Sequence, residues 1–302
     1  MLTIFSTPKP FIGHSNVIQR NALRSWTLLH PDVDVILFGD EEGAADACRD
    51  LGIRHEPHVR RNERGTKYLN YLFDRARDIS CHKFICYSNC DIILTLDFLE
   101  GLELVARSYS RFLMIGRRWD TDIIEPWDFS QPDWAQRLRS FALLKGKQAG
   151  PSWIDYFCFS RNLYYEKMPP FLIGRNNWDP WLSWHARKSK AHLIDASEMV
   201  IAVHQNHDYA YLGEGATAQQ NKAEADYNGS MGDTRAWHYY KYGVDAATEI
   251  LSEGRLRANH LAWLGPIKTR AITYLYYAWW ACLGATRPIR HRLGLRSATS
   301  KS

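Results

Sequence analysis

Two polar residues, Asn89 and Asp91, follow directly on an apolar run at residues 84–87. The run Phe-Ile-Cys-Tyr is typical of a strand that is buried on both faces of a parallel sheet. Residues two apart in an extended segment point the same way, so the two polar side chains share one face. Oxygen ligands in this arrangement suit Mg²⁺ or Mn²⁺, and α/β sheets bind ligands at the carboxyl ends of their strands. The pattern predicts a cation site that could hold a diphosphate; a turn or helix cap is the alternative.

The segment resembles the Asp-x-Asp motif of GT-A glycosyltransferases, with Asn89 in place of the first aspartate. These enzymes take a sugar from a nucleotide-diphosphate donor, and they often complete their metal site with a histidine far downstream of the motif. The resemblance therefore implies that Asp91 and His204 bind the metal and that Asn89 lies at the donor. His207 and Asp208 are alternative ligands, because they follow His204 closely.

Asp179 precedes Pro180, the pattern of a helix N-cap followed by proline at the first helical position. In GT-A enzymes an acidic residue at the start of the corresponding helix takes the proton from the acceptor hydroxyl, and the resemblance implies this role for Asp179. Trp178, Trp181 and Trp184 would add surface for stacking on sugars. A base so placed implies inversion at the anomeric carbon. If Asp179 only caps the helix, a retaining mechanism stays open.

Other polar and aromatic residues lie near the ends of predicted strands and helices. Asp40 follows one strand, where it could bind a ribose or base or simply cap the next helix. Arg64 and Lys67 flank a glycine before a helix and could bind phosphate or belong to a solvated loop. Asp155 interrupts an apolar strand, so it needs a partner or faces the cleft. The donor-binding candidates are Thr7, Lys9, Asp40, Arg64, Lys67 and Asn89. The acceptor-binding candidates are Trp119, Asp120, Asp155, Trp178 and Trp181.

An α/β sheet must position these residues. Apolar runs at 2–6, 33–38 and 53–56 alternate with helical spacing at 15–29 and 44–51. This order predicts a parallel sheet with right-handed crossovers, the nucleotide-binding half of a doubly wound fold. The predicted fold class is α/β, a GT-A-like, Rossmann-like and mostly parallel sheet with flanking helices. Further strands are predicted at 111–116, 153–160 and 193–195, and further helices at 68–77, 95–108 and 133–144.

Composition allows a full core: the 302 residues are 45% hydrophobic and 24% charged, so folding requires neither metal nor disulfide. The six cysteines form no Cys-x-x-Cys pair and are predicted to be reduced, as in a cytosolic protein. A zinc site is the alternative for one group of residues, although a strand through them would scatter the thiols. That group is Cys81, His82, Cys86 and Cys90.

The carboxyl-terminal region is basic and aromatic. Residues 261–302 hold seven Lys or Arg and no Asp or Glu, against a net charge of +5 for the chain. The uncharged run 271–285 is shorter than the roughly 20 residues that cross a bilayer. Its aromatic residues and flanking cations suit the headgroup boundary; a buried helix is the alternative. Charge confined to such a tail argues against nucleic acid as a partner.

Three regions are therefore expected: a GT-A-like catalytic domain at 1–215, a helical and loop region over the cleft at 216–265, and a helical, membrane-associating tail at 266–302. Because Met1 opens directly into a strand, no signal peptide is predicted, and the expected location is cytoplasmic, peripheral on the inner face of the cell membrane.

The predicted function is a glycosyltransferase that moves a sugar from a nucleotide-diphosphate donor to a saccharide or lipid-linked saccharide, as in bacterial surface-polysaccharide synthesis. Mn²⁺ or Mg²⁺ would assist. One alternative is a nucleotidyltransferase of the same sheet architecture, which would be expected to carry a glycine-rich basic loop where residues 7–10 read Thr-Pro-Lys-Pro. The other is an inactive membrane-bound scaffold, for which Asn89 is the strongest argument.

Overall fold

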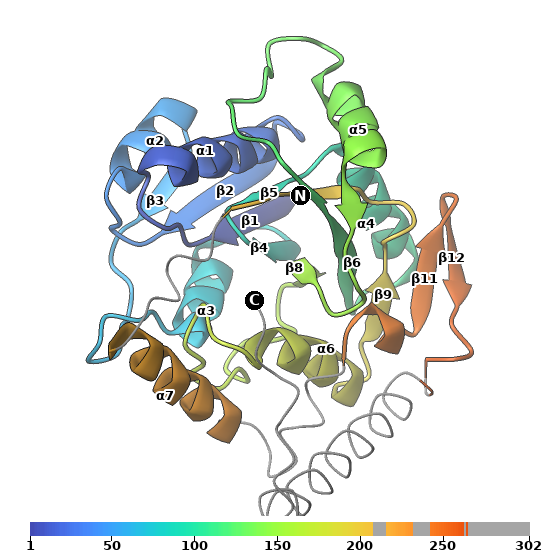
Figure 1. The fold of residues 1–302 in the computed structure, drawn as a ribbon. Helices are drawn as coiled ribbons and strands as arrows, with labels where there is room; N and C mark the ends of the chain where they lie inside the picture. Colours follow the sequence, from blue (N-terminus) through green and yellow to red (C-terminus); the bar gives the residue numbers. More distant parts are fainter. Residues whose placement is uncertain (208–215, 232–241, 263, 265–302) are drawn as a thin grey trace, which may run out of the picture.

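A mixed sheet forms the centre of the computed structural model, which describes residues 1–207, 216–231, 242–262 and 264 (Figure 1). The strands are β1 (Leu2–Ser6), β2 (Val33–Phe38), β3 (Arg54–Glu56), β4 (Phe84–Ser88), β5 (Ile92–Ile93), β6 (Phe112–Thr121), β7 (Lys147–Gln148), β8 (Ile154–Ser160), β9 (His192–Asp195), β10 (Ala202–Gln205), β11 (Glu249–Ser252) and β12 (Arg255–Ala258). The helices are α1 (Gly13–Thr27), α2 (Ala44–Leu51), α3 (Leu69–Ile79), α4 (Leu96–Ser108), α5 (Trp134–Lys145), α6 (Trp178–Lys188) and α7 (Ala216–Ser230). The main sheet runs in the order β12-β11-β9-β6-β8-β4-β1-β2-β3.

The amino-terminal half follows the prediction. Strand β1 pairs in parallel with β2 on one side and with β4 on the other, and β2 pairs in parallel with β3. Helices α1 and α2 connect the first three strands in sequence. The carboxyl ends of β1 and β4 therefore meet at one edge of the sheet, and Asn89 and Asp91 follow β4 at that edge.

The main sheet is mostly parallel, as predicted, and β8 and β12 are the strands of it that run the other way. Strand β8 lies between β4 and β6 and is antiparallel to both. An antiparallel strand begins at the edge where its neighbour ends. The start of β8, with Asp155, is consequently next to the segment that follows β4, and the Asn89 amide donates its backbone hydrogen bond to the carbonyl of Asp155 at 2.9 Å.

Strand β6 is longer than predicted, because it continues past Gly116 to Thr121. The pairing with β8 shifts register between Ile115 and Arg117. A Cβ at Gly116 would lie 2.3 Å from the Tyr156 hydroxyl, so glycine allows the close approach there. Beyond the shift β6 pairs in parallel with β10. Residues 117–120 are thus part of the strand, with alternate side chains on opposite faces.

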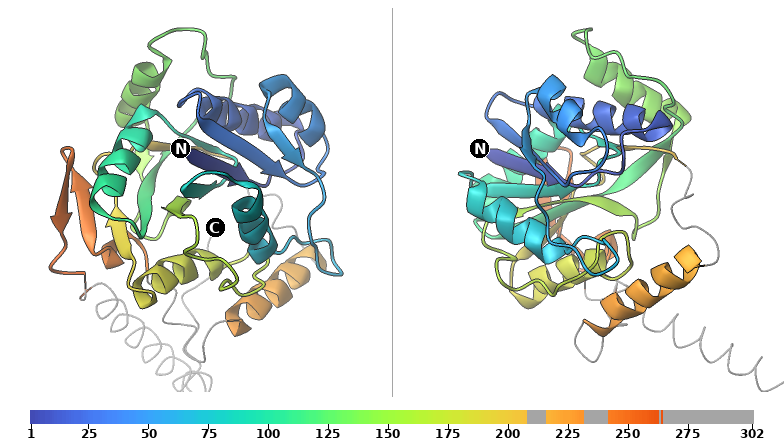
Figure 2. Two further views of the ribbon diagram at one scale, coloured as in Figure 1. Left: turned by 180° about the vertical axis from the view of Figure 1, so that it is seen from behind. Right: turned by 90° about the vertical axis from the view of Figure 1, so that its left-hand side faces the viewer.

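Helices cover both faces of the sheet (Figures 1 and 2). One core cluster joins α3 and α6 to one face, through residues such as Phe73 and Leu182. A second cluster joins α1, α2 and α4 to the other face, through residues such as Trp26 and Phe98. The two faces together confirm the predicted α/β sheet with flanking helices and give the site a rigid support.

The described part of the predicted helix and loop region at 216–265 includes strands. Helix α7 occupies the first part, but β11 pairs in parallel with β9 and β12 pairs with β11, so this segment extends the main sheet. The predicted tail at 266–302 lies outside the described residues. Among the helices that the structure describes, none has the length and apolar character that crossing a bilayer requires.

Candidate active site

A cavity of about 440 Å³ lies at the carboxyl ends of β1 and β4. Its walls come from the loop after β1, from α1, from the segment after β4, and from the starts of β8 and α6. The residues predicted from the sequence that line it are Thr7, Lys9, Asn89, Asp91, Asp155, Asp179 and His204. Residues that are far apart in the chain thus line one cavity, which was expected for polar residues at the carboxyl ends of strands in an α/β sheet.

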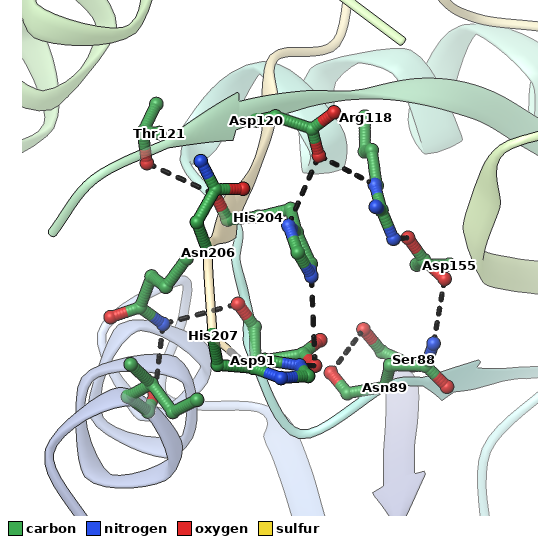
Figure 3. Close-up of polar contacts among 12 residues, drawn as sticks. Ser88, Asn89, Asp91, Arg118, Asp120, Thr121, Asp155, His204, Asn206 and His207 are labelled. Carbon is green, nitrogen blue, oxygen red and sulfur yellow. Dashed lines mark hydrogen bonds and ion pairs between the residues drawn. The ribbon is translucent and has the colours of Figure 1, made fainter. Parts of the chain in front are cut away.

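Asp91, His204 and His207 form a cluster at one side of this cavity (Figure 3). The Nε2 atom of His207 lies 3.1 Å from Oδ2 of Asp91, and the Nε2 atom of His204 lies 3.8 Å from the same oxygen. One ligand atom from each residue lies within 4.8 Å of the other two. His207, expected only as an alternative to His204, belongs to the cluster together with it. Asp208, the other alternative, lies outside the described residues.

Strand β10 holds the cluster together. It pairs with β6 on one side and with β5 on the other, which places His204 opposite Asp120 and Ile92. Gln205 then ties the strand to Asp91, because its side-chain Nε2 donates to the Asp91 carbonyl at 3.1 Å. Sheet pairing therefore fixes His204, and the Gln205 hydrogen bond holds the backbone of Asp91 beside it.

The cluster fits a divalent cation. Oδ1 of Asp91 is buried and has no hydrogen-bond partner among the described residues. An unpaired buried carboxylate oxygen is costly, and a cation would compensate it. Burial alone would raise the pKa of Asp91, but the His207 hydrogen bond and the charges of both imidazoles hold it below its ordinary value. One carboxylate and two imidazoles are ligands that Mn²⁺ accepts.

Asp120 and Arg118 form a second layer behind His204. Oδ1 of Asp120 lies 3.1 Å from Nδ1 of His204 and accepts a hydrogen bond from Nε of Arg118 at 2.7 Å. The contact between Asp120 and His204 has an ion-pair distance but not the geometry of a hydrogen bond. A carboxylate beside Nδ1 leaves Nε2 on the side of Asp91, the arrangement from which carboxylate–histidine–metal triads are built. This arrangement corrects the expected role of Asp120 in acceptor binding. Asp120 does not line the cavity and instead orients a ligand residue.

Asp155 has the partners that its buried position in an apolar strand called for. Nη1 of Arg118 donates to its Oδ2 at 2.7 Å, and Nδ2 of Asn89 donates to its Oδ1 at 2.6 Å. Burial raises the pKa of Asp155, whereas the Arg118 guanidinium opposes the shift. Both carboxylate oxygens of Asp155 already accept hydrogen bonds from the protein. Asp155 is therefore better suited to support the cavity wall than to bind the sugar acceptor. Asn89 likewise uses its amide on Asp155.

Asp179 lines the cavity from the first turn of α6. Helix α6 begins at Trp178 with Asn177 as N-cap, so Asp179 is the second helical residue and Pro180 the third. The prediction that Asp179 is the N-cap is wrong. Burial raises the pKa of Asp179 to about 7; nearby Asp155 adds to the shift, and the backbone N–H of Asp179 itself opposes it. A carboxyl with this pKa is suited to exchange protons near neutral pH.

The tryptophans near Asp179 are core residues. Trp178 is 8% exposed and packs its ring against Tyr87 and Phe157, at centroid distances of 5.3 and 5.4 Å. Trp181 is 4% exposed and stacks on His185. Neither ring is available to a sugar, which corrects their assignment to acceptor binding.

Trp119 also differs from its prediction, because it lies on the face of β6 that packs against residues such as Ile123 and Leu138. The indole that does line the cavity is Trp153, which is 50% exposed and lies beneath the Arg118 guanidinium at 4.6 Å from the ring centroid. Its place at the start of a predicted strand was a weak signal for this role.

The predicted donor residues divide into two groups. Thr7, Lys9 and Asn89 line the cavity. Asp40 is instead exposed beside a separate hollow, where it pairs with Arg61. Arg64 is exposed and lines neither hollow.

Lys67 lies behind the cavity wall, with Nζ 2.6 Å from Oε1 of Glu41 and hydrogen-bonded to Thr7. The structure thus places Asp40, Arg64 and Lys67 outside the lining of this cavity.

The alternative zinc set does not assemble. Cys86 and Cys90 are buried in the core, whereas Cys81 is exposed at the opposite end of β4. Cys81 and His82 instead lie near Asp34, and these three have ligand atoms within 4.8 Å of one another. The described cysteines are free thiols.

No protein-family model and no curated protein sequence matches the chain. The fold is similar to that of glucosyl-3-phosphoglycerate synthase from Mycobacterium tuberculosis in complex with Mg²⁺ and uridine diphosphate, with 14% identity, a TM-score of 0.45, and coverage of 78% of this chain and 81% of that one. It is also similar to TarS residues 1–349 from S. aureus in complex with UDP-GlcNAc, with 6% identity, a TM-score of 0.48, and coverage of 80% and 70%.

Proposed function

We propose that this chain is a GT-A-like, divalent-metal-assisted glycosyltransferase that uses a nucleotide-diphosphate sugar. The supporting observation is that a metal-ligand cluster and a carboxyl with a pKa of about 7 line one cavity. Asp91, His204 and His207 would hold the cation, and Asp179 would act on the acceptor. Asn89 does not weaken the cluster, because its amide belongs to the Asp155 network.

Each residue of the cavity has a definite task in this proposal. When bound, a divalent cation would stabilise the negative charge on the departing diphosphate. Two imidazoles beside one carboxylate favour Mn²⁺ over Mg²⁺, which prefers oxygen ligands. Lys9 lines the same cavity and adds positive charge near Asp91. Trp153 offers an aromatic surface on which a sugar or base can stack.

Asp179 would remove the proton from the acceptor hydroxyl. With a pKa of about 7, the carboxylate form is populated at and above neutral pH. The rate of transfer should therefore rise about tenfold per pH unit below pH 7 and level off above it. Direct attack assisted by this base implies inversion at the anomeric carbon.

A nucleotide-sugar panel tests the proposal. UDP-, GDP- and dTDP-sugars are mixed with the full chain, with and without Mn²⁺, and both thermal shift and release of the nucleoside diphosphate are measured. One donor class is expected to raise the melting temperature only when Mn²⁺ is present, because the cation links the protein to the diphosphate. Absence of any Mn²⁺-dependent shift or turnover would contradict the proposal and favour a non-enzymatic scaffold.

Two variants sharpen this experiment. Asp179→Asn should lower transfer by roughly 10²- to 10⁴-fold and leave the Mn²⁺-dependent donor shift intact, since an amide cannot accept the proton. Asp34→Asn is the matched control, because Asp34 belongs to the other metal-like group and is 58% exposed. It should change neither measurement. Unchanged turnover in Asp179→Asn would remove Asp179 from its proposed role.

A lipid-linked acceptor at a membrane surface stays part of the proposal on sequence grounds alone. The support is the basic, aromatic composition of residues 266–302. The full chain should sediment with vesicles containing about 30% phosphatidylglycerol and be released by salt, whereas a chain ending at residue 264 should stay in solution. Equal sedimentation of both chains would argue against the tail as the anchor.

A further inference from the structure

A second, smaller cavity of about 270 Å³ adjoins the first one at Asp179. The two cavities share Ser152, Ile154 and Asp179 in their walls. The larger cavity holds the metal-ligand cluster, and the smaller one does not. Asp179 therefore lies between the place proposed for the donor and a space large enough for a single sugar ring.

Asn177 lines the smaller cavity and has an unused hydrogen-bond acceptor. Its side chain is buried, with 4% of the residue exposed, and Oδ1 has no hydrogen-bond partner among the described residues. An N-cap asparagine usually accepts from the N–H of the second or third helical residue. Here the third residue is Pro180, which has no N–H, and Asn177 has a left-handed backbone with φ of 89°. The local sequence thus leaves Oδ1 without the usual donor.

The smaller cavity carries little charge. Of its lining residues in the described part of the chain, Asp179 alone is ionisable near neutral pH; Ser152, Asn176, Asn177 and Tyr242 are polar and uncharged. The larger cavity, by contrast, includes Lys9 and Arg118. A phosphate or carboxylate on the acceptor would meet Asp179 with no cation from these lining residues to offset the repulsion.

We propose that the smaller cavity binds an uncharged, hydroxyl-bearing sugar as acceptor, with one hydroxyl on Asp179 and a neighbouring hydroxyl donating to Oδ1 of Asn177. Tyr242 supplies an aromatic surface for the sugar ring. In the transfer, the acceptor oxygen forms the new bond to the anomeric carbon, the bond from that carbon to the diphosphate breaks, and the hydroxyl proton passes to Asp179. This inference rests on the proposed function and adds the acceptor class to it.

Matched acceptors test the inference. Methyl glucoside, its uronic acid and its 6-phosphate share one ring and differ in the group at C6, which is neutral in the first and negatively charged in the other two. The corresponding galactose set is tested in parallel. Transfer is measured with the donor that the panel identifies, and hydrolysis of that donor is recorded without acceptor. The neutral member of a set is expected to have a kcat/KM about tenfold or more above that of its charged members.

Two variants address the wall of the smaller cavity. Asn177→Gly keeps the left-handed backbone and removes the amide, so the acceptor KM should rise about tenfold while donor hydrolysis stays unchanged. Asn176→Lys adds a cation at an exposed lining residue and should reduce the preference for the neutral acceptor; Gln131→Lys, exposed elsewhere, is its control and should not.

The outcomes separate the two proposals. A chain that neither binds nor hydrolyses any donor overturns the proposed function, and the acceptor inference falls with it. A chain that hydrolyses the donor but uses charged members as well as neutral ones, or uses no member of either set, overturns the acceptor inference alone. An unchanged acceptor KM in Asn177→Gly would also overturn it.

Discussion

Two neighbouring groups of buried polar residues in the cavity differ in how fully they are paired. In the network of Arg118, Asp155 and Asn89, both Asp155 oxygens accept hydrogen bonds, at 2.6 and 2.7 Å. In the cluster of Asp91, His204 and His207, Oδ1 of Asp91 has no partner among the described residues. Both groups lie at the same edge of one sheet (Figure 3).

This difference in hydrogen bonding indicates that the Arg118, Asp155 and Asn89 network supports the cavity wall, whereas the Asp91 cluster is suited to bind a ligand. A saturated ion pair stabilises the wall only while both partners are present, whereas an unsatisfied buried carboxylate oxygen destabilises the empty site and is compensated by a ligand. Substitutions in the network should therefore change stability first. Substitutions in the cluster should change metal binding and activity and leave stability almost unaffected.

Arg118→Met should give the largest effect, a loss of about 3–5 kcal/mol in the free energy of unfolding, because it leaves Asp155 buried without its cation. Urea denaturation measures this loss. The double variant Arg118→Met with Asp155→Asn removes both charges and should recover most of the lost stability. A loss below about 1 kcal/mol in the single variant would mean that the pair is not a structural support.

Asp91→Asn should lower transfer about a hundred- to a thousandfold, the scale of losing one electrostatic contact to the transition state. Isothermal titration with Mn²⁺ should show greatly weakened binding. Urea denaturation without metal should show only a small loss of stability near neutral pH, because the lowered pKa of Asp91 means that the folded state favours its carboxylate. A variant that unfolds easily without metal would mean that Asp91 stabilises the fold as Asp155 does, and the two groups of residues would then not differ in role.

Asp120→Asn should have a smaller effect, a fall of about 10- to 100-fold in Mn²⁺ affinity. The substitution removes the carboxylate charge beside Nδ1 of His204, but Asp120 itself is not a proposed metal ligand. Since Asp120 also accepts from Arg118, stability is measured in parallel. An affinity equal to that of the unmodified chain would contradict the second-layer role.

Asp179→Asn should produce a modest change in stability, and of the substitutions considered it should depend most on pH. Burial raises the pKa of Asp179 from its ordinary 3.8 to about 7, so the folded state binds more protons than the unfolded state between these values. Stability due to this group is therefore present below about pH 4 and lost as the pH rises through 7.

The Asp179→Asn variant should be more stable than the original chain at pH 8 and equal to it near pH 4. The expected difference at pH 8 is on the order of 1 kcal/mol, because position 179 is partly exposed. Melting curves at both values check this; an equal difference at both would contradict the shifted pKa.

Local sequence patterns predicted much of the framework. The bounds of β1, β2 and α2 agree with the predicted runs, and Asn89 and Asp91 follow β4 as expected. Periodicity reports which residues are buried, and the ends of buried parallel strands report where polar residues gather. These two signals pointed to Asp91. The resemblance to GT-A enzymes added His204 and Asp179, and the structure places all three in the lining of one cavity.

Periodicity does not report what a buried residue touches, and here the tertiary structure decided the outcome. The direction of β8 set the partners of Asp155, because an antiparallel neighbour brings its start to the cavity edge. Trp178 and Asp120 have residue types that suit sugar binding, but packing placed one in the core and the other behind His204. The sequence alone determined which side chains can bind a metal, a proton or a sugar. Which of them face the cavity was decided by the pairing of strands that are far apart in the chain, because the pairing of each strand depends on the whole sheet.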